Sequence, residues 1–289
     1  MSLLQVIILA IVQGLTELLP VSSSAHVVVA EKLMGLDPSS PPMTLSLVML
    51  HTGTMFAVIV YFWRQWRSAY FQSMAAFKGV AVNIVLATVL TGAIGEAIVK
   101  VIERIALRDV KGAQIEDLFG RLELIAPALA LAGALMLIAG VVAKRDAGGS
   151  TTEASGVNSR QACLIGTVQA LCLPFRGFSR SGATISTARL AGVRKTRAEA
   201  FSFALAVVLT PAVVAREAVR LVHVQSESGA SSLLSDATPS LLGAVFAFLA
   251  GLVALKWLSQ WLEGGRWYQF GVYCIVAASV VAGLHRFGW

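Results

Sequence analysis

Glu17, Ser23 and His26 are side chains whose types and spacing suit a hydrolytic reaction. They supply a carboxylate, a hydroxyl and an imidazole within one short segment. A serine nucleophile needs a base, and the base works better when a third group orients it. The grouping predicts catalysis with Ser23 as the nucleophile, His26 as its general base or acid and Glu17 beside them. The structural alternative is a serine-rich turn that only caps a helix.

Glu17 lies in an apolar stretch, where an ionised side chain is costly and is by default a functional candidate. Gln13 precedes it by four residues, so the two side chains share one face of a helix. The pair predicts a divalent-cation site, with Glu17 and the amide oxygen of Gln13 as metal ligands. Glu17 also suits a general base, and a protonated Glu17 bonded to a neighbouring helix is the structural alternative. His51 is either a further group of the same cavity or a core histidine.

A second polar segment, residues 174–184, has the composition of an anion-binding loop. Arg180 offers a planar fork that grips two phosphate oxygens, and Gly177 and Gly182 let backbone N–H groups turn toward an anion. The hydroxyl groups expected to bind phosphate are those of Ser22, Ser179, Ser181 and Thr184. Such a loop at the start of a helix predicts phosphate binding. A polar turn with a snorkelling arginine is the alternative.

The chain carries an internal duplication. Gln13 and Gln169 begin similar segments, each followed by a proline and a serine-containing run, and they are 156 residues apart. Ser46 and Ser202 lie in similar tripeptides at the same spacing. Two matches at one offset indicate a repeat. We expect repeat 1 over about residues 1–143, a linker over 144–160 and repeat 2 over about 161–289.

The composition of the 289-residue chain is that of a polytopic membrane protein. Hydrophobic residues make up 56% of it, charged residues only 13%, and the mean hydropathy is +0.75. An average soluble domain has about 25% charged residues, so a soluble globule and a disordered chain are both excluded. The net charge of +7 suits basic loops at a membrane face, and we expect no nucleic-acid partner.

Six stretches are long and apolar enough to cross a bilayer. They are residues 45–62, 80–99, 124–143, 201–219, 241–258 and 267–284. Two further apolar stretches, 3–19 and 162–174, end at a proline and a polar run, which favours re-entrant hairpins lining a wet cavity. The expected fold is all-α, with six transmembrane helices and two re-entrant helical hairpins.

Three full crossings separate the two hairpins, so the second repeat is expected to be inverted relative to the first. One side of the membrane then carries eleven Lys and Arg residues and the other carries nine. This difference weakly favours the first side as cytoplasmic and places both termini outside.

Three segments together resemble the signatures of the bacitracin-resistance type undecaprenyl-diphosphatases. They are Gln13 to Glu17, Leu18 to His26 and Gly177 to Thr184. The resemblance covers nearly the whole chain. It implies a multi-pass enzyme of the bacterial inner membrane that hydrolyses undecaprenyl diphosphate to undecaprenyl phosphate and inorganic phosphate at the outer face. It also implies a divalent cation, Mg²⁺ or Ca²⁺, recycling of the lipid carrier for peptidoglycan synthesis, and bacitracin resistance.

The resemblance also implies which residues are essential. Those that match the family's essential positions are Glu17, Ser23, His26 and Arg180, with Gln13 where the family has Glu or Gln. Two residues depart from the family's pattern. Arg176 stands where proline is usual, so it either adds positive charge near the diphosphate or points elsewhere. Ala25 stands where glycine is common.

The sequence leaves several functions open. The leading one is metal-assisted hydrolysis of the diphosphate, either through Ser23 or by direct attack of water. Inverted repeats also recur in transporters, so flipping of a polyprenyl phosphate is the second hypothesis. A membrane component without turnover is the third. The substrate and the lipid bilayer are the expected partners, and the sequence does not decide between a monomer and a homodimer.

Overall fold

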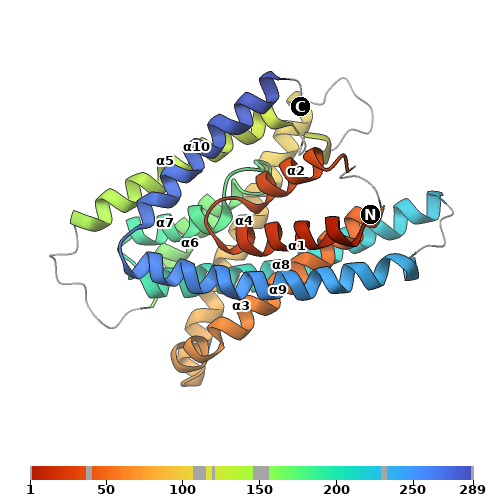
Figure 1. Cartoon of the computed structure of the whole chain (residues 1–289). Helices are drawn as coiled ribbons and strands as arrows, with labels where there is room; N and C mark the ends of the chain where they lie inside the picture. Colours follow the sequence, from red (N-terminus) through yellow and green to blue (C-terminus); the bar gives the residue numbers. More distant parts are fainter. Residues whose placement is uncertain are drawn as a thin grey trace.

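The computed structural model of the chain describes residues 2–36, 41–106, 115–118, 121–145, 156–228 and 233–287. Within these ranges the chain is all-helical, with ten α-helices and one short 3₁₀ helix, Ile115–Leu118 (Figure 1). The first five α-helices are α1 (Leu3–Leu18), α2 (Ser23–Leu33), α3 (Pro41–Tyr70), α4 (Met74–Ala106) and α5 (Leu122–Arg145). The second five are α6 (Ser159–Ala170), α7 (Arg180–Leu190), α8 (Lys195–Ser228), α9 (Leu233–Glu263) and α10 (Trp267–Arg286). The predicted all-α class is confirmed.

Helices α1 and α6 begin in the same way. Ser2 and Asn158 are their N-cap residues, and each forms a capping box with the glutamine three positions later. The box satisfies backbone N–H groups that have no partner inside the helix. Helix α1 ends at Leu18 because Pro20 disfavours helical backbone at the residue before it, and Leu19 is extended.

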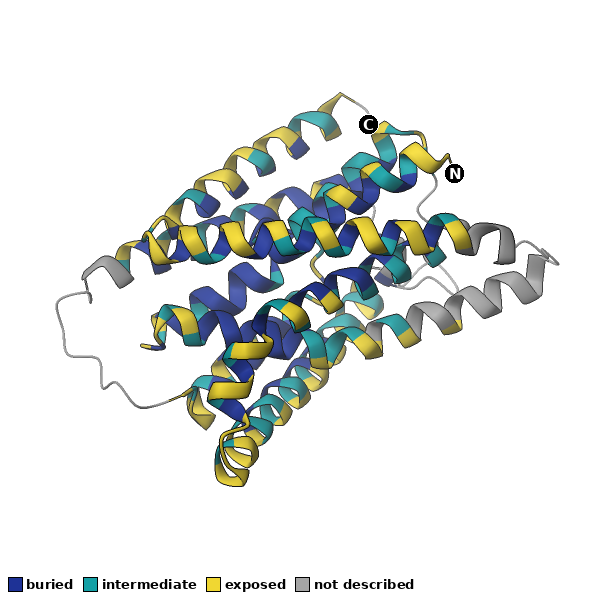
Figure 2. Ribbon diagram, turned by 60° about the horizontal axis from the view of Figure 1, so that its bottom comes forward, coloured by how far each residue is buried: buried dark blue, intermediate teal, exposed yellow. Residues whose placement is uncertain are grey.

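Over the part of the chain that the structure describes, five of the helices are long and apolar enough to cross a membrane. These candidate spans are Leu45–Tyr70, Met74–Ile105, Leu122–Val142, Thr238–Glu263 and Trp267–Arg286. Large apolar side chains on them, such as Val60, Val89 and Leu131, are more than half exposed. Figure 2 shows such exposed residues along the outer faces of the long helices. A surface of this kind indicates a multi-pass membrane protein.

Two predicted segments fall partly outside the described residues. The fourth predicted span, residues 201–219, forms the middle of α8, but several of its side chains are not described, and the count of five spans does not include it. Most of the predicted linker, residues 146–155 of 144–160, is likewise outside the described residues.

The long helices enclose the short ones. Helix α9 packs against α1 and α3, α4 packs against α6, and α5 and α10 lie along each other, as Figure 1 also shows. Helix α7 packs against α5, α6 and α8, and most of its residues are buried. The polar side chains that α7 and its neighbour α6 carry are therefore held inside the bundle.

Two short non-helical segments interrupt the helices near the centre. We call residues 19–22, between α1 and α2, the first break, and residues 171–179, between α6 and α7, the second break. Ser22 in the first break has a φ of 67°, and Gly177 in the second has a φ of 106°. A positive φ is rare for a residue other than glycine, so the backbone of Ser22 is strained.

Candidate active site

The helix α7, which follows the second break, contacts the end of α1 and the first break directly. Arg180, the first residue of α7, donates from Nη2 to Oε1 of Glu17 near the end of α1, at 3.0 Å. Ser181 Oγ donates to the backbone carbonyl of Leu19 at 3.3 Å. Residues 163 positions apart in the sequence therefore form one ion pair, where the end of α1 meets the start of α7. Sequence reasoning placed Glu17 and Arg180 in one pocket, and the structure brings them together.

Glu17 is the centre of a set of polar contacts. Its Oε1 takes the ion pair with Arg180, while its Oε2 accepts from Ser23 Oγ at 2.5 Å and from Gln13 Nε2 at 3.1 Å. His51 Nε2 lies 3.9 Å from the same Oε2. The side chain of Glu17 is only 16% exposed. A carboxylate held by an arginine and two neutral donors is fixed in orientation, and a hydroxyl as close as that of Ser23 is placed to give up its proton to it.

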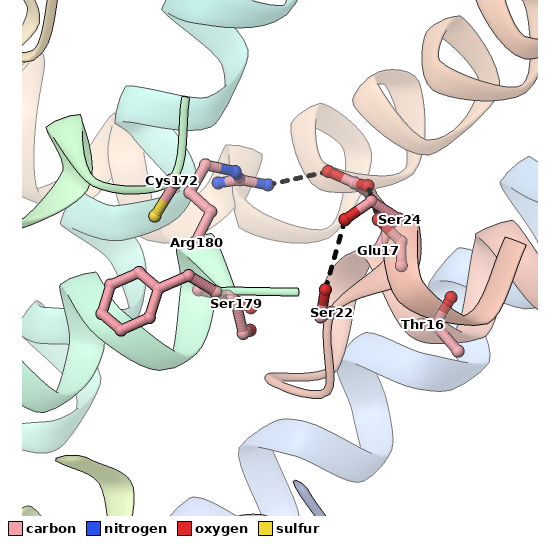
Figure 3. Close-up of a pocket in the computed structure, with 10 residues that line it drawn as sticks. Thr16, Glu17, Ser22, Ser24, Cys172, Ser179 and Arg180 are labelled. Carbon is pink, nitrogen blue, oxygen red and sulfur yellow. Dashed lines mark hydrogen bonds and ion pairs between the residues drawn. The ribbon is translucent and has the colours of Figure 1, made fainter. Parts of the chain in front are cut away.

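A cavity of about 90 Å³ opens beside this cluster (Figure 3). Its lining residues are Thr16, Glu17, Ser22, Ser23, Ser24, Cys172, Phe178, Ser179, Arg180 and Ser181. Figure 3 shows Arg180 approaching Glu17 from one side, with Ser22 and Ser24 below the carboxylate. Hydroxyl groups and a guanidinium dominate the lining, which therefore suits a small anion better than an apolar ligand.

Other predicted phosphate ligands have structural contacts instead. Gly177 packs so tightly against α5 that a Cβ would lie 2.6 Å from the carbonyl oxygen of Ile125. The N–H of Gly182 donates to Ser179 Oγ, which caps α7, so this N–H is not left for an anion. Thr184 is fully buried and bonds to Ser202 at 2.6 Å. None of these three residues lines the described cavity.

His26 does not contact Ser23 in the way that the sequence suggests. Its Nδ1 lies 2.8 Å from the carbonyl oxygen of Ser22, and its Nε2 lies 2.7 Å from the hydroxyl of Tyr273 on α10. Both ring nitrogens are therefore occupied, and the group that accepts from Ser23 is Glu17. The expected pairing of Ser23 with His26 is replaced because α1 presents its carboxylate to Ser23 while α10 takes the imidazole.

Sequence reasoning also missed several neighbours of the site. Thr16, Cys172 and Phe178 line the cavity, and Tyr273 reaches His26 across 247 positions. No local motif marks Tyr273, which lies in an apolar helix. Arg176 acts electrostatically on the buried Glu31 of α2 and does not line the cavity, so its charge acts between the second break and α2.

The donor set limits how a divalent cation is held. Among the described residues, no three His, Cys, Asp or Glu side chains converge to form a protein cage. Glu17 is the one carboxylate among the lining residues, with the amide of Gln13 beside it. One carboxylate and a neutral oxygen fit a cation whose other ligands are substrate phosphates and water.

Comparisons with known proteins identify the family of the chain. It is 55% identical over 284 residues to a protein of Acinetobacter baylyi named undecaprenyl-diphosphatase 2, covering 97% of both chains. It is 31% identical over 299 residues to undecaprenyl-diphosphatase 2 of Burkholderia ambifaria, covering all of this chain and 97% of that one. Residues 6–280 match the family of the bacitracin resistance protein BacA. The chain therefore belongs to this family, as its motifs in the two breaks predict.

Proposed function

We propose that this protein hydrolyses undecaprenyl diphosphate to undecaprenyl phosphate and inorganic phosphate, and thereby recycles the lipid carrier and confers bacitracin resistance. The observation that carries the proposal is the convergence of Ser23 and Arg180 on Glu17 in one cavity. The names of the relatives in Acinetobacter baylyi and Burkholderia ambifaria support the same substrate.

The cavity supplies what a diphosphate needs. Arg180 uses Nη2 for Glu17, while its Nη1 is buried and has no hydrogen-bond partner among the described residues. A buried donor without a partner is costly, so this site is stabilised when an anionic oxygen enters. Ser22, Ser24 and Ser181 add hydroxyl groups around the same space. The large polyprenyl tail then stays among the exposed apolar faces of the surrounding helices.

The contact between Ser23 and Glu17 supports a covalent first step. Ser23 Oγ attacks the terminal phosphorus, and Glu17 accepts the hydroxyl proton across the 2.5 Å contact. The bond from the terminal phosphorus to the bridging oxygen breaks, and undecaprenyl phosphate leaves. The leaving undecaprenyl phosphate takes up that proton, which frees the carboxylate of Glu17. Water then attacks the phosphoserine and gives a proton to Glu17. As the bond from phosphorus to Oγ breaks, Glu17 passes this proton to Ser23 Oγ, and inorganic phosphate is released. Arg180 neutralises charge on the transferring phosphoryl group, as such loose transition states require.

Direct attack by water is the competing route, and it uses the same residues. Glu17 then takes a proton from water, and Ser23 only binds the phosphate. Acid quenching of an enzyme that is turning over substrate labelled in its terminal phosphate separates the two. We expect the label to be trapped on Ser23; a quenched enzyme without label would favour water.

We also propose that a divalent cation, Mg²⁺ or Ca²⁺, enters with the diphosphate and that Glu17 and the amide oxygen of Gln13 hold it. The cation supplies further neutralisation of phosphate charge. Gln13 Nε2 donates to Glu17, so Oε1 is the atom of Gln13 that would bind the cation. Removal of metal with a chelator, followed by addition of Mg²⁺ or Ca²⁺, tests this part.

For the membrane arrangement, we propose six transmembrane helices and two re-entrant hairpins in an inverted repeat. Helix boundaries support it, because α1 and α6 begin at Leu3 and Ser159, 156 residues apart, which is the offset of the duplication. The packing supports it as well, since α1 packs on α9 and its counterpart α6 packs on α4. We place the protein in the bacterial inner membrane, with the cavity open to the outer face.

The decisive experiment is phosphate release from undecaprenyl diphosphate by protein purified in detergent micelles. We expect turnover by the wild type and a loss of at least ~10³-fold in Glu17→Gln and in Arg180→Ala, because each removes a charge at the reacting phosphate. Glu96→Gln and Arg121→Ala are matched controls, since both side chains are more than half exposed on their own surfaces. Near-normal turnover in either site variant would overturn the assignment.

The same assay separates hydrolysis from transport. Micelles have no two sides, so a protein that only flips a polyprenyl phosphate releases no phosphate in them. Absence of phosphate release by the folded wild type, with metal present, would favour the flippase or a component without turnover.

A further inference from the structure

Helix α10 contacts the first break on a side that does not line the cavity. Tyr273 places its hydroxyl 2.7 Å from His26 Nε2, and the two rings stack nearly parallel, with centroids 5.7 Å apart and an interplanar angle of 12°. The next residue, Cys274, directs Sγ toward the carbonyl oxygen of Pro20 at 3.5 Å. Two consecutive residues of α10 therefore touch the chain before and after Ser22. Tyr273 is absent from the cavity lining.

The contacts of His26 define the tautomer of its ring. The carbonyl oxygen of Ser22 only accepts hydrogen bonds, so the Nδ1 atom 2.8 Å away carries a proton. In the neutral ring Nε2 is then the acceptor, and the hydroxyl of Tyr273 donates to it. The imidazole is fixed in orientation from both sides, by backbone on one and by α10 on the other.

His26 in turn holds the strained part of the first break. Ser22 is the one residue other than glycine with a positive φ among the described residues, and no side chain caps α2 at this position. Its carbonyl accepts from His26 twice, from Nδ1 at 2.8 Å and from the backbone N–H at 3.4 Å. The same peptide leads directly into Ser23, so its orientation sets where Ser23 Oγ points. Strained backbone persists only where its surroundings hold it.

We propose that Tyr273 is a positioning residue that holds His26 as the Nδ1–H tautomer. His26 in turn orients the Ser22 peptide, which keeps Ser23 Oγ within hydrogen-bond distance of Glu17. In this arrangement His26 acts on Ser23 through the backbone and does not receive its proton. The kinetic part of the proposal rests on the proposed hydrolysis; the part that concerns the ring of His26 does not.

The first test measures the tautomer directly. Protein labelled with ¹⁵N in its histidines and held in detergent micelles is studied by NMR, and the His26 signals are identified as those lost in His26→Asn. We expect a proton on Nδ1 and an unprotonated, hydrogen-bonded Nε2 in the wild type. Tyr273→Phe, which keeps the stacked ring but removes the hydroxyl, shifts the Nε2 signal or brings in the second tautomer. A proton on Nε2 in the wild type, or an unchanged spectrum in Tyr273→Phe, would overturn the proposal.

The second test is kinetic. In Tyr273→Phe we expect kcat to fall about tenfold, the scale of one lost hydrogen bond, while KM changes by less than about twofold because Tyr273 does not touch the cavity. Tyr268→Phe on the same helix, where Tyr268 packs against Gly140 of α5, is the matched control. An active wild type with unchanged kcat in Tyr273→Phe refutes the positioning role alone. An inactive wild type refutes the proposed hydrolysis and leaves the NMR result standing.

Discussion

A serine lies at the same position of the repeat at the end of each break, and the two serines make different contacts. Ser23 and Ser179 are 156 positions apart, which is the offset of the duplication. Ser179 is the N-cap of α7, and its Oγ accepts from the N–H of Gly182 at 3.2 Å. Ser23 caps nothing and donates to Glu17 instead. Because the hydroxyl oxygen of Ser179 is engaged in capping α7, we expect only Ser23, which caps no helix, to react.

The glutamines show the same division. Gln13 donates to Glu17, whereas Gln169 donates to Thr91 on α4 inside an interface between helices. The residue at the offset from Glu17 is Leu173, and the residue at the offset from Ser24 is Arg180. Each repeat therefore contributes one charge of the central ion pair and a neutral residue at the other position. A site of this kind needs both halves, because neither half contains the carboxylate and the guanidinium together.

The largest difference that we expect concerns the two serines. Ser23→Ala should lower phosphate release by ~10³-fold or more with little change in stability, because it removes the hydroxyl that Glu17 activates. Ser179→Ala should instead destabilise the protein by about 1 kcal/mol, the usual cost of a lost N-cap, and lower Tm by a few degrees. Phosphate release and thermal unfolding in detergent measure both. Similar losses of activity in the two variants would contradict the division of labour between the breaks.

Much of this site could be predicted from the sequence, because its signals lie within short segments of the chain. The proline and serine-rich runs after α1 and α6 locate the breaks. Glu17 stands out because charges are rare in apolar segments, and Arg180 because it lies among glycines and serines that suit an anion. Which donor faces which acceptor could not be predicted. Ser23 and His26 share a helix face, but the packing of α1 and α10 decides that Ser23 meets Glu17 and that His26 meets Tyr273. Contacts between distant helices leave no trace in local spacing.

Each break contains one residue with a positive φ, Ser22 in the first and Gly177 in the second. Substitutions at these two residues test what the backbone conformation contributes. Gly177→Ala should destabilise the protein by about 3 kcal/mol, because its φ of 106° disfavours a side chain and the Cβ would lie 2.6 Å from the Ile125 carbonyl oxygen. Gly192→Ala also has a positive φ, of 81°, but nothing within 4 Å, so it isolates the conformational cost at about 1 kcal/mol.

The reverse exchange in the first break is Ser22→Gly. Glycine adopts a φ of 67° without strain, so stability should stay level or rise by up to about 1 kcal/mol. Activity should fall nevertheless, because a freer peptide no longer fixes Ser23 and because the cavity loses the hydroxyl of Ser22. Thermal unfolding and phosphate release of the purified variants separate the two effects. A Ser22→Gly variant that loses stability and keeps full activity would show that the strain at this position does not aim Ser23.

The last comparison concerns α3 and α8, the helices that follow α2 and α7. Glu199 near the start of α8, ahead of the predicted span, is 4% exposed and accepts from Ser259 Oγ at 2.7 Å, whereas the residue at the offset in α3 is the buried Met43. Burial raises the pKa of Glu199 from 4.5 to about 7. Unfolded chains therefore release this proton at lower pH than the folded protein does. The group costs nothing below about pH 4.5, and stability declines as the pH rises from there to about 7.

Glu199→Gln keeps the shape of the side chain and removes this titration. We expect the fall in stability between pH 5 and pH 8, up to about 2–3 kcal/mol at this site, to become smaller in the variant. Thermal unfolding across that pH range measures it, with Glu96→Gln as the control because Glu96 is exposed and paired with Lys100. Parallel curves for the wild type and Glu199→Gln would mean that Glu199 is already ionised in the folded protein. The protonation state of this carboxyl would then be determined by neighbouring charges rather than by burial. At this position α8 would differ from α3 in its electrostatics more than in its packing.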